Sequence, residues 1–195
     1  MSDDKNRVCP VELAGSLDNR IRRWLQNPHK ILSPYVREGM TVLDVGCGPG
    51  FFSIEMAQMV GPGGRVIAAD LQEGMLDKLR AKIRGTGFEK RVKLVKCDQD
   101  NLNVSDRVDF ILTFYVVHEV PDRRALFRQL HALLNDDGTY LLVEPKLFHV
   151  SRREFEATIE FAQEEGFKVQ AGPRLLASWS AILTRKTNHG DRDQP

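Results

Sequence analysis

Short apolar segments alternate with helix-like segments along most of this chain, and this alternation restricts the possible folds most strongly. The apolar segments are rich in Val, Ile, Leu and Phe, as is typical of strands buried on both faces. Between them, apolar residues recur at helical spacing, which predicts amphipathic helices. Strands are expected at 41–45, 65–70, 91–98, 108–117, 139–145, 167–172 and 178–186. Helices are expected at 51–60, near 75–83, from 121 to 134 and from 151 to about 165.

Strands joined by helices pair in parallel, with helices on both faces of the sheet. The last two expected strands have no helix between them, which permits an antiparallel pair at one edge. We therefore predict one doubly wound α/β domain over 9–186, with a helical cap at 9–39, a core at 40–186 and disordered tails at 1–8 and 187–195. The pair Asn27-Pro28 indicates a helix start within the cap.

The composition argues against several classes of partner. The chain has 28 Lys and Arg against 27 Asp and Glu, so no overall field favours nucleic acid or an anionic membrane. No run reaches the roughly 18 apolar residues of a membrane span, and no secretory signal is recognised. The cysteines, Cys9, Cys47 and Cys97, show no CxxC spacing, which argues against a disulfide framework or a zinc site. We expect a cytoplasmic protein without a metal, nucleic-acid or membrane partner.

The segment VLDVGCGPG places Asp44 at the end of an apolar strand and glycines directly after it. In such sheets, ligands bind at the carboxyl ends of the strands, most often at the first strand-to-helix turn. A dinucleotide loop requires GxGxxG, but Phe51 stands where the third glycine belongs. Asp44 would also repel a pyrophosphate, whereas it suits a cationic ligand. No Gly-Lys-Ser/Thr follows, so a nucleotide P-loop is excluded.

This loop, the acid of VIAAD (Asp70), the acid of KCD (Asp98) and the segment VDFILTFYVVHEV together resemble the class I S-adenosylmethionine-dependent methyltransferases. They look most like the small methyltransferases often called type 11. The resemblance covers about residues 27–186. It implies a mostly parallel, seven-stranded Rossmann-like sheet, with S-adenosylmethionine as cofactor and S-adenosylhomocysteine as product.

The resemblance also assigns expected contacts to residues. Asp44 would face the cofactor amino group, usually through water, the main chain of Gly46 would contact the same end, and Gly48 would avoid a clash. Asp70, 20 positions after Gly50, would bind the ribose diol. The other expected contacts are Leu71 and Met75 on the adenine face, Asp98 and Gln99 at its edge, Cys47 within the loop, and the main chain of Phe114 and Tyr115. Taken singly, Asp70 or Asp98 could instead be a helix cap.

Three residues at or just after the end of the fourth expected strand are candidates for catalysis: Tyr115, His118 and Glu119. His118 titrates in the range of a general base. The alternative interpretation is that His118 and Glu119 only cap or pack in the turn before Pro121. Glu144 could also line the pocket, and Leu17, Ile21 and Trp24 could form a lid or simply pack against the sheet.

The sequence does not name the methyl acceptor, but it argues against some classes of acceptor. Transfer from a sulfonium is an in-line displacement on an activated carbon, so a recognisable base is not required. An [N/D]PP[Y/F] stretch, typical of enzymes that methylate amines of bases or a glutamine amide, is replaced by Phe114-Tyr115-Val116-Val117. The cysteines do not match arsenite methylation, and the downstream signature of quinone-ring methyltransferases is not found. A small-molecule acceptor is expected. The alternative is a cofactor-binding module that is inactive without a partner protein; the oligomeric state is left open.

Overall fold

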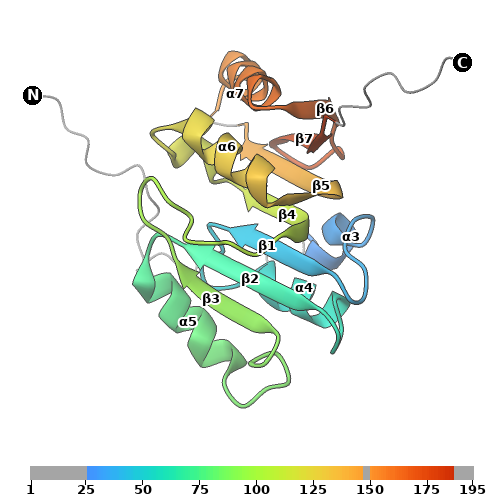
Figure 1. Ribbon diagram of the computed structural model, residues 1–195, viewed down its shortest axis with the longest axis vertical. Coiled ribbons are helices and arrows are strands. Elements are labelled where there is room, and N and C mark those ends of the chain that lie inside the picture. The colour runs from blue at the N-terminus through green and yellow to red at the C-terminus, as the bar shows by residue number, and fades with distance from the viewer. Residues whose placement is uncertain (1–25, 147–149, 187–195) are drawn as a thin grey trace, which may run out of the picture.

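The computed structural model describes residues 26–146 and 150–186. Its strands form one seven-stranded sheet in the order β3-β2-β1-β4-β5-β7-β6 (Figure 1). The strands are β1 Thr41–Val45, β2 Arg65–Asp70, β3 Val92–Lys96, β4 Val108–Phe114, β5 Leu134–Pro145, β6 Phe167–Ala171 and β7 Ser178–Arg185. Strands β1 to β5 pair in parallel, and β7 runs antiparallel to both β5 and β6. The predicted doubly wound sheet with an antiparallel edge pair is confirmed.

Among the described residues, one helix precedes β1 and the others each come after a strand. They are α3 Pro28–Leu32, α4 Ser53–Met59, α5 Glu73–Ile83, the 3₁₀ turn η2 Val117–Glu119, α6 Arg123–Leu133 and α7 Arg152–Glu164. Two predicted starts are confirmed by their caps. The Asn27 side chain accepts the Lys30 amide before α3, and Ser151 and Glu154 form a reciprocal capping box before α7.

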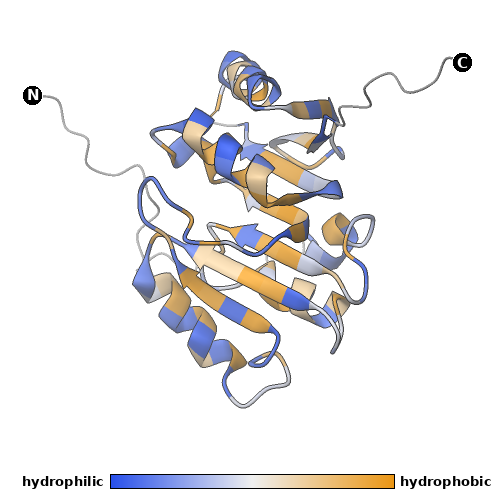
Figure 2. Cartoon of the chain, in the orientation of Figure 1, coloured by the Kyte–Doolittle hydropathy of each residue, from blue (hydrophilic) through white to orange (hydrophobic). Residues whose placement is uncertain are grey.

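The core consists of two apolar clusters whose residues alternate along the strands. In β1, Val42 belongs to the cluster with α4 and α5, whereas Leu43 belongs to the cluster with α6 and α7. Neighbouring Leu141 and Leu142 of β5 divide in the same way. Because successive side chains of a strand point to opposite faces, the two clusters lie on opposite sides of the sheet. The hydrophobic strands between mixed helices are visible in Figure 2.

The ends of two strands differ most from the expected ones. β4 ends at Phe114 rather than at 117, and β5 begins at Leu134 rather than at 139, with irregular pairing to β4 between Val108 and Phe110. As in the expected elements, no helix lies between β3 and β4, where residues 97–107 cross as a loop. Val95 and Leu102 are nevertheless buried, so the loop covers apolar surface that a helix would otherwise cover.

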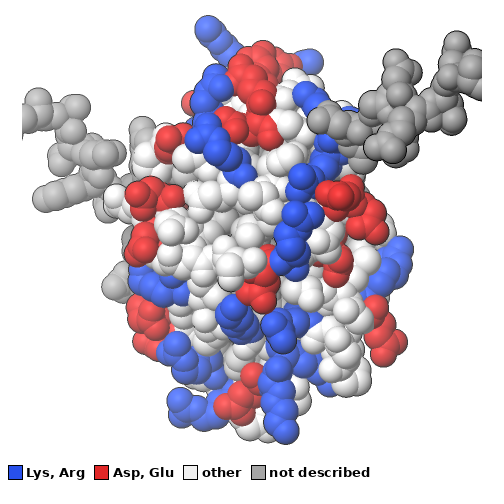
Figure 3. All heavy atoms as spheres, in the orientation of Figure 1, with Lys and Arg blue, Asp and Glu red and all other residues white. Residues whose placement is uncertain are grey.

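Helix α3 lies within the predicted cap at 9–39, while Leu17, Ile21 and Trp24 lie outside the described residues. The boundaries at 9 and 186 and the two tails therefore stay predictions. No helix in 26–146 or 150–186 has the length and apolar character needed to cross a bilayer. Positive and negative side chains are interspersed over the face in Figure 3, as a balanced composition predicts.

Candidate functional site

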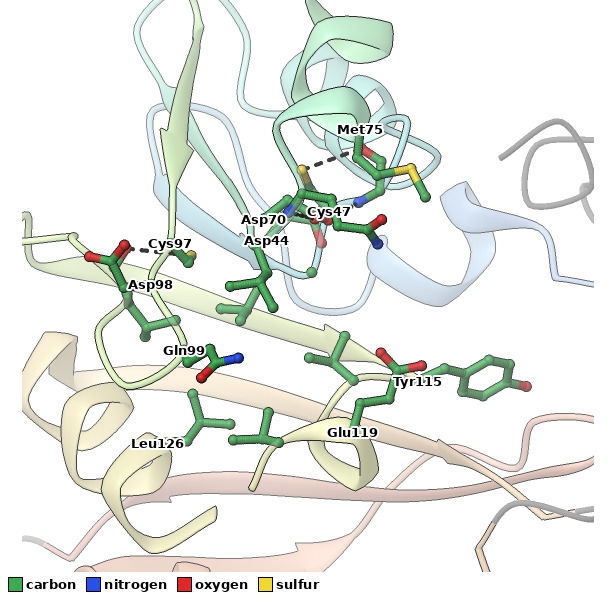
Figure 4. A pocket seen from close by; sticks show the side chains of 18 of the residues that line it. Asp44, Cys47, Asp70, Met75, Cys97, Asp98, Gln99, Tyr115, Glu119 and Leu126 are labelled. Carbon is green, nitrogen blue, oxygen red and sulfur yellow. Dashed lines mark hydrogen bonds between the residues drawn. The ribbon is translucent and has the colours of Figure 1, made fainter. Parts of the chain in front are cut away.

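A cavity of about 450 Å³ opens at the carboxyl ends of β1, β2 and β4, where the strand order reverses. Its walls come from the β1–α4 loop, the start of α5, the loop after β3 and the segment from Phe114 to α6. All eleven expected cofactor contacts line it: Asp44, Gly46, Cys47, Gly48, Asp70, Leu71, Met75, Asp98, Gln99, Phe114 and Tyr115. Figure 4 shows Asp70 and Cys47 on one side of this space and Leu126 and Glu119 on the other.

The glycines at the β1–α4 turn have different physical roles. Gly46 has φ +67°, and a Cβ there would lie 2.4 Å from Val116 Cγ2, so a side chain is sterically excluded. Gly48 has φ +52°, but a Cβ there would meet nothing within 4 Å. Gly46 thus allows the segment after β4 to pack against the loop, whereas Gly48 leaves open space beside the cavity.

Asp44 is held by a residue that the sequence did not single out. Its carboxylate is buried, and Oδ2 accepts the Ser53 hydroxyl at 2.5 Å. Ser53 is the first residue of α4, so this hydrogen bond joins β1 to the helix after the loop. Asp44 and Ser53 are nine residues apart, and no sequence motif links them, because only the turn between β1 and α4 brings them together.

Asp70 ends β2 with both carboxylate oxygens facing main-chain donors. Oδ2 accepts the Gly48 amide and Oδ1 accepts the Gln72 amide, each at 2.8 Å. Burial raises the pKa of this carboxyl above its ordinary value, although both amide hydrogen bonds oppose that shift. Because each oxygen has a second lone pair, Asp70 can accept further hydroxyl protons from a diol.

The β2–β3 side of the cavity combines apolar and polar residues. Met75 is buried, and Leu71 and Gln99 line the same space. Asp98 is exposed, and its Oδ2 accepts from Asn103 Nδ2 at 2.9 Å. Several lining residues have no motif that marks them in the sequence. Gln72, Leu102, Val116 and Val120 lie in irregular segments, and Leu126 belongs to α6.

The two cysteine thiols beside the cavity are not suited to nucleophilic chemistry. Burial raises the pKa of Cys47 well above its usual value, and the neighbouring Asp44 adds to this. Burial likewise raises the pKa of Cys97 to about 12. Since the thiolate is the reactive form, these thiols act as small apolar groups.

Tyr115 contributes main chain rather than its hydroxyl. It has φ +65°, an uncommon conformation for a residue with a side chain, and its amide donates to Val143 in β5. Figure 4 shows the ring pointing away from the cavity. The hydroxyl bonds Ser178 Oγ at 2.6 Å and accepts from Gln26 Nε2 at 2.9 Å. The Tyr115 hydroxyl is therefore not placed to act as a base on a molecule in the cavity.

His118 and Glu119 lie on η2, but they face different surroundings. Glu119 lines the cavity, whereas His118 is turned towards Glu144 of β5. Glu144 is 1% exposed and accepts the amides of Val116, Val117 and His118 at 2.9–3.2 Å. Its Oε2 also lies 2.5 Å from His118 Nδ1. Glu144 thus fixes the segment that forms one wall of the cavity, rather than lining the cavity itself.

The charges of the cavity have one sign. Its described lining contains six carboxylates and no Lys, Arg or His: Asp44, Asp70, Asp98, Asp100, Glu119 and Asp122. Such a lining opposes a pyrophosphate and attracts a cation. S-adenosylmethionine carries a sulfonium, an ammonium group and a ribose diol beside one carboxylate, so these acceptor groups fit the cationic and hydroxyl groups of this cofactor.

Comparison with known proteins gives the same family. A family model described as "Methyltransferase domain" matches residues 36–186. A solved S-adenosylmethionine-dependent methyltransferase from Aquifex aeolicus superposes with a TM-score of 0.78 at 25% identity, covering 90% of this chain and 97% of that one. A TehB-like methyltransferase from Corynebacterium glutamicum shares the fold, with a TM-score of 0.68 at 17% identity and coverage of 90% and 93%.

Two curated relatives have names that refer to quinones. A demethylmenaquinone methyltransferase of Lactobacillus johnsonii is 33% identical over 110 residues, which are 56% of this chain and 45% of the relative. A ubiquinone/menaquinone biosynthesis C-methyltransferase, UbiE, of Enterobacter sp. (strain 638) is also 33% identical, over 56% and 44% of the two chains. The chain thus spans less than half the length of these relatives. The family match, the fold and the acceptor groups that line the cavity agree: this chain belongs to the methyltransferase-domain family and has the fold of the class I S-adenosylmethionine-dependent methyltransferases.

Proposed function

We propose that the chain transfers the methyl group of S-adenosylmethionine to a small, uncharged or cationic molecule. The observation that carries this proposal is the lining of six carboxylates without a cationic side chain among the described residues. The bound cofactor supplies an electrophilic methyl carbon, and the cavity has to hold a nucleophile about 3–3.5 Å from it and exclude water. An acceptor with a carboxylate or phosphate would be repelled by the same lining.

The cofactor contacts follow from the positions of the side chains. Asp44, oriented by Ser53, would face the cofactor ammonium, and Asp70 would accept the ribose hydroxyls. Leu71 and Met75 would contact the adenine face, with Asp98 and Gln99 at its edge. Main chain at Gly46, Cys47 and Gly48, and at Phe114 and Tyr115, would surround the methionine end.

A neutral quinol is a suitable first acceptor. Two relatives are named as quinone methyltransferases, which supports a quinol as the acceptor. The downstream signature of quinone-ring methyltransferases is nevertheless not found in this chain. We also propose a cytoplasmic location, because the buried Cys47 and Cys97 are free thiols and form no disulfide with each other. It includes no nucleic-acid or membrane partner, on the basis of the balanced charge.

Cofactor binding is tested first. S-adenosylhomocysteine should raise the melting temperature of the full chain, and Asp70→Ala should abolish this rise, since binding to the native state alone stabilises it. The exposed Asp137→Ala is the matched control and should keep the rise. A shift with NAD but with neither S-adenosyl compound would overturn the proposal.

Methyl transfer is tested with a matched pair of acceptors, 1,4-dihydroxynaphthalene and 1,4-dihydroxy-2-naphthoate, alongside a phenol and a primary amine. Release of S-adenosylhomocysteine should be faster with the neutral naphthalene than with its carboxylate. Equal or faster turnover of the anion would contradict the charge argument. Tight cofactor binding with no turnover, restored by a copurifying protein, would favour the alternative of a binding module that needs a partner.

A further inference from the structure

A buried carboxylate, an imidazole and a cavity-facing carboxylate follow one another at the wall between β4 and α6. Glu144 Oε2 lies 2.5 Å from His118 Nδ1, and His118 Nε2 lies 4.0 Å from Glu119 Oε1. The Glu119 side chain lies at the cavity in Figure 4. The three groups therefore lead from the cavity into the protein interior.

The hydrogen bonds of Glu144 assign the proton on His118. Both Glu144 oxygens accept main-chain amides, Oε1 from Val116 and Val117 and Oε2 from His118. A carboxylate in this role is an acceptor, so the imidazole donates through Nδ1. In the neutral imidazole, Nε2 then carries the lone pair, and it faces Glu119. The same logic orients a histidine base in acid–histidine pairs of hydrolases.

We propose that Glu119, His118 and Glu144 form a proton relay for the acceptor, whose nucleophilic atom therefore carries a proton at neutral pH. This inference rests on the proposed methyl transfer and names the acceptor class as protic: a hydroxyl, an amine or an acidic C–H. Glu119 is the catalytic residue of the relay, because it faces the acceptor side. His118 and Glu144 are positioning residues that act through Glu119.

The step balances in atoms and charge. The acceptor atom bonds to the methyl carbon while the carbon–sulfur bond breaks. The electron pair of the broken bond stays on sulfur, which becomes a neutral thioether. The acceptor proton moves to the Glu119 carboxylate and then to His118 Nε2, which forms an imidazolium beside Glu144. A torsion of the Glu119 side chain or a bridging water closes the 4.0 Å gap between Glu119 and His118.

Other charges around His118 have to be considered in its pH response. Arg123 of α6 donates to the His118 carbonyl at 3.4 Å and to Thr158 of α7 at 3.0 Å. Glu154, in the first turn of α7, interacts electrostatically with His118. The charged groups around the imidazole are thus the carboxylates of Glu119, Glu144 and Glu154 and the guanidinium of Arg123.

The first test does not depend on an acceptor. ¹⁵N NMR of the histidine-labelled full chain with S-adenosylhomocysteine should show neutral His118 protonated on Nδ1, with the signal assigned by its loss in His118→Gln. Neutral His118 protonated on Nε2 would overturn the relay. Because this readout needs no turnover, it separates failure of the relay from failure of the proposed function.

The second test is kinetic and uses 1,4-dihydroxynaphthalene. Glu119→Gln should lower kcat by a factor of about 100 or more while changing the Kd of S-adenosylhomocysteine less than twofold. The wild-type kcat should fall in acid, and His118→Gln should lower kcat and remove that pH dependence. Glu119→Asp should recover part of the rate, and the exposed Glu156→Gln should match wild type.

A large loss of cofactor affinity in Glu119→Gln without a change in kcat, or an unchanged pH profile in His118→Gln, would contradict the proposal.

Discussion

At the scale of single residues, the cavity depends on positions where a side chain is either excluded or fixed by main-chain amides. Gly46 faces Val116, and Asp70 is held by the amides of Gly48 and Gln72. A substitution at Gly46 is expected to change the stability of the fold, whereas a substitution at Asp70 is expected to change the charge of the site.

Gly46→Ala should destabilise the fold by about 1–3 kcal/mol, because it combines a positive φ with a methyl group inside the contact distance of Val116. Urea unfolding of the variant would measure the loss. Gly63→Ala is the control, since Gly63 has open space and no positive φ, and its stability should change little. Equal stability of the two variants would contradict the steric role of Gly46.

Affinity for S-adenosylhomocysteine should fall as the pH is lowered towards the acid range. The raised pKa of Asp70 means that its carboxylate is neutralised at a higher pH than an ordinary aspartate. Ribose binding uses the anion, so the loss begins above the usual aspartate range. Calorimetry between about pH 4 and 7 would measure it. Asp70→Asn should bind at least about tenfold more weakly at pH 7 and lose this component of the pH dependence. An acid-range profile identical to wild type would count against the role of Asp70.

At the scale of elements, the site is built where strands end and helices begin. Ser53 connects α4 to Asp44 of β1, and Glu144 of β5 holds the segment after β4 through three amides. These contacts couple elements that are adjacent in the sheet, since β1 and β5 both pair with β4. The position of the cavity wall therefore depends on strand pairing as well as on the loops.

Ser53→Ala should lower the free energy of unfolding by about 1.5–3 kcal/mol, because a buried carboxylate loses a hydroxyl donor. It should also weaken S-adenosylhomocysteine binding, since Asp44 would no longer be oriented. Urea unfolding and calorimetry measure the two effects. The exposed Ser105→Ala serves as the control and should match wild type in both. If Ser53→Ala also matched wild type, the hydrogen bond would have no such role.

At the scale of the whole molecule, the sheet separates two apolar clusters. Ile83 of α5 belongs to one and Leu130 of α6 to the other, and both side chains are buried. Residues on opposite faces share no contacts through which a cavity could relax, so we expect the clusters to contribute independently.

Ile83→Val should cost about 0.5–1.5 kcal/mol and Leu130→Ala about 2–5 kcal/mol. The double variant should cost their sum within about 0.5 kcal/mol, as urea unfolding of the three proteins would measure. A larger deviation from additivity would mean that the two clusters are coupled through the sheet.

Local patterns in the sequence were enough to predict the sheet, its antiparallel edge and eleven of the residues that line the cavity. Continuous apolar strands require burial on both faces, and the chain order of strand and helix leaves few arrangements. The same argument placed Asp44 and Asp70 at one edge, because parallel strands bring their carboxyl ends together. Those inferences depend on local patterns and could be made without coordinates.

The tertiary structure alone decided which of the candidate catalytic side chains face the cavity. Tyr115, His118 and Glu119 are close in sequence, yet the Tyr115 ring points away, His118 turns to Glu144 and Glu119 lines the cavity. Their directions depend on a positive φ at Tyr115 and on a carboxylate 26 residues beyond His118. Side-chain direction in an irregular segment is set by long-range hydrogen bonds, which leave no periodic signal in the chain.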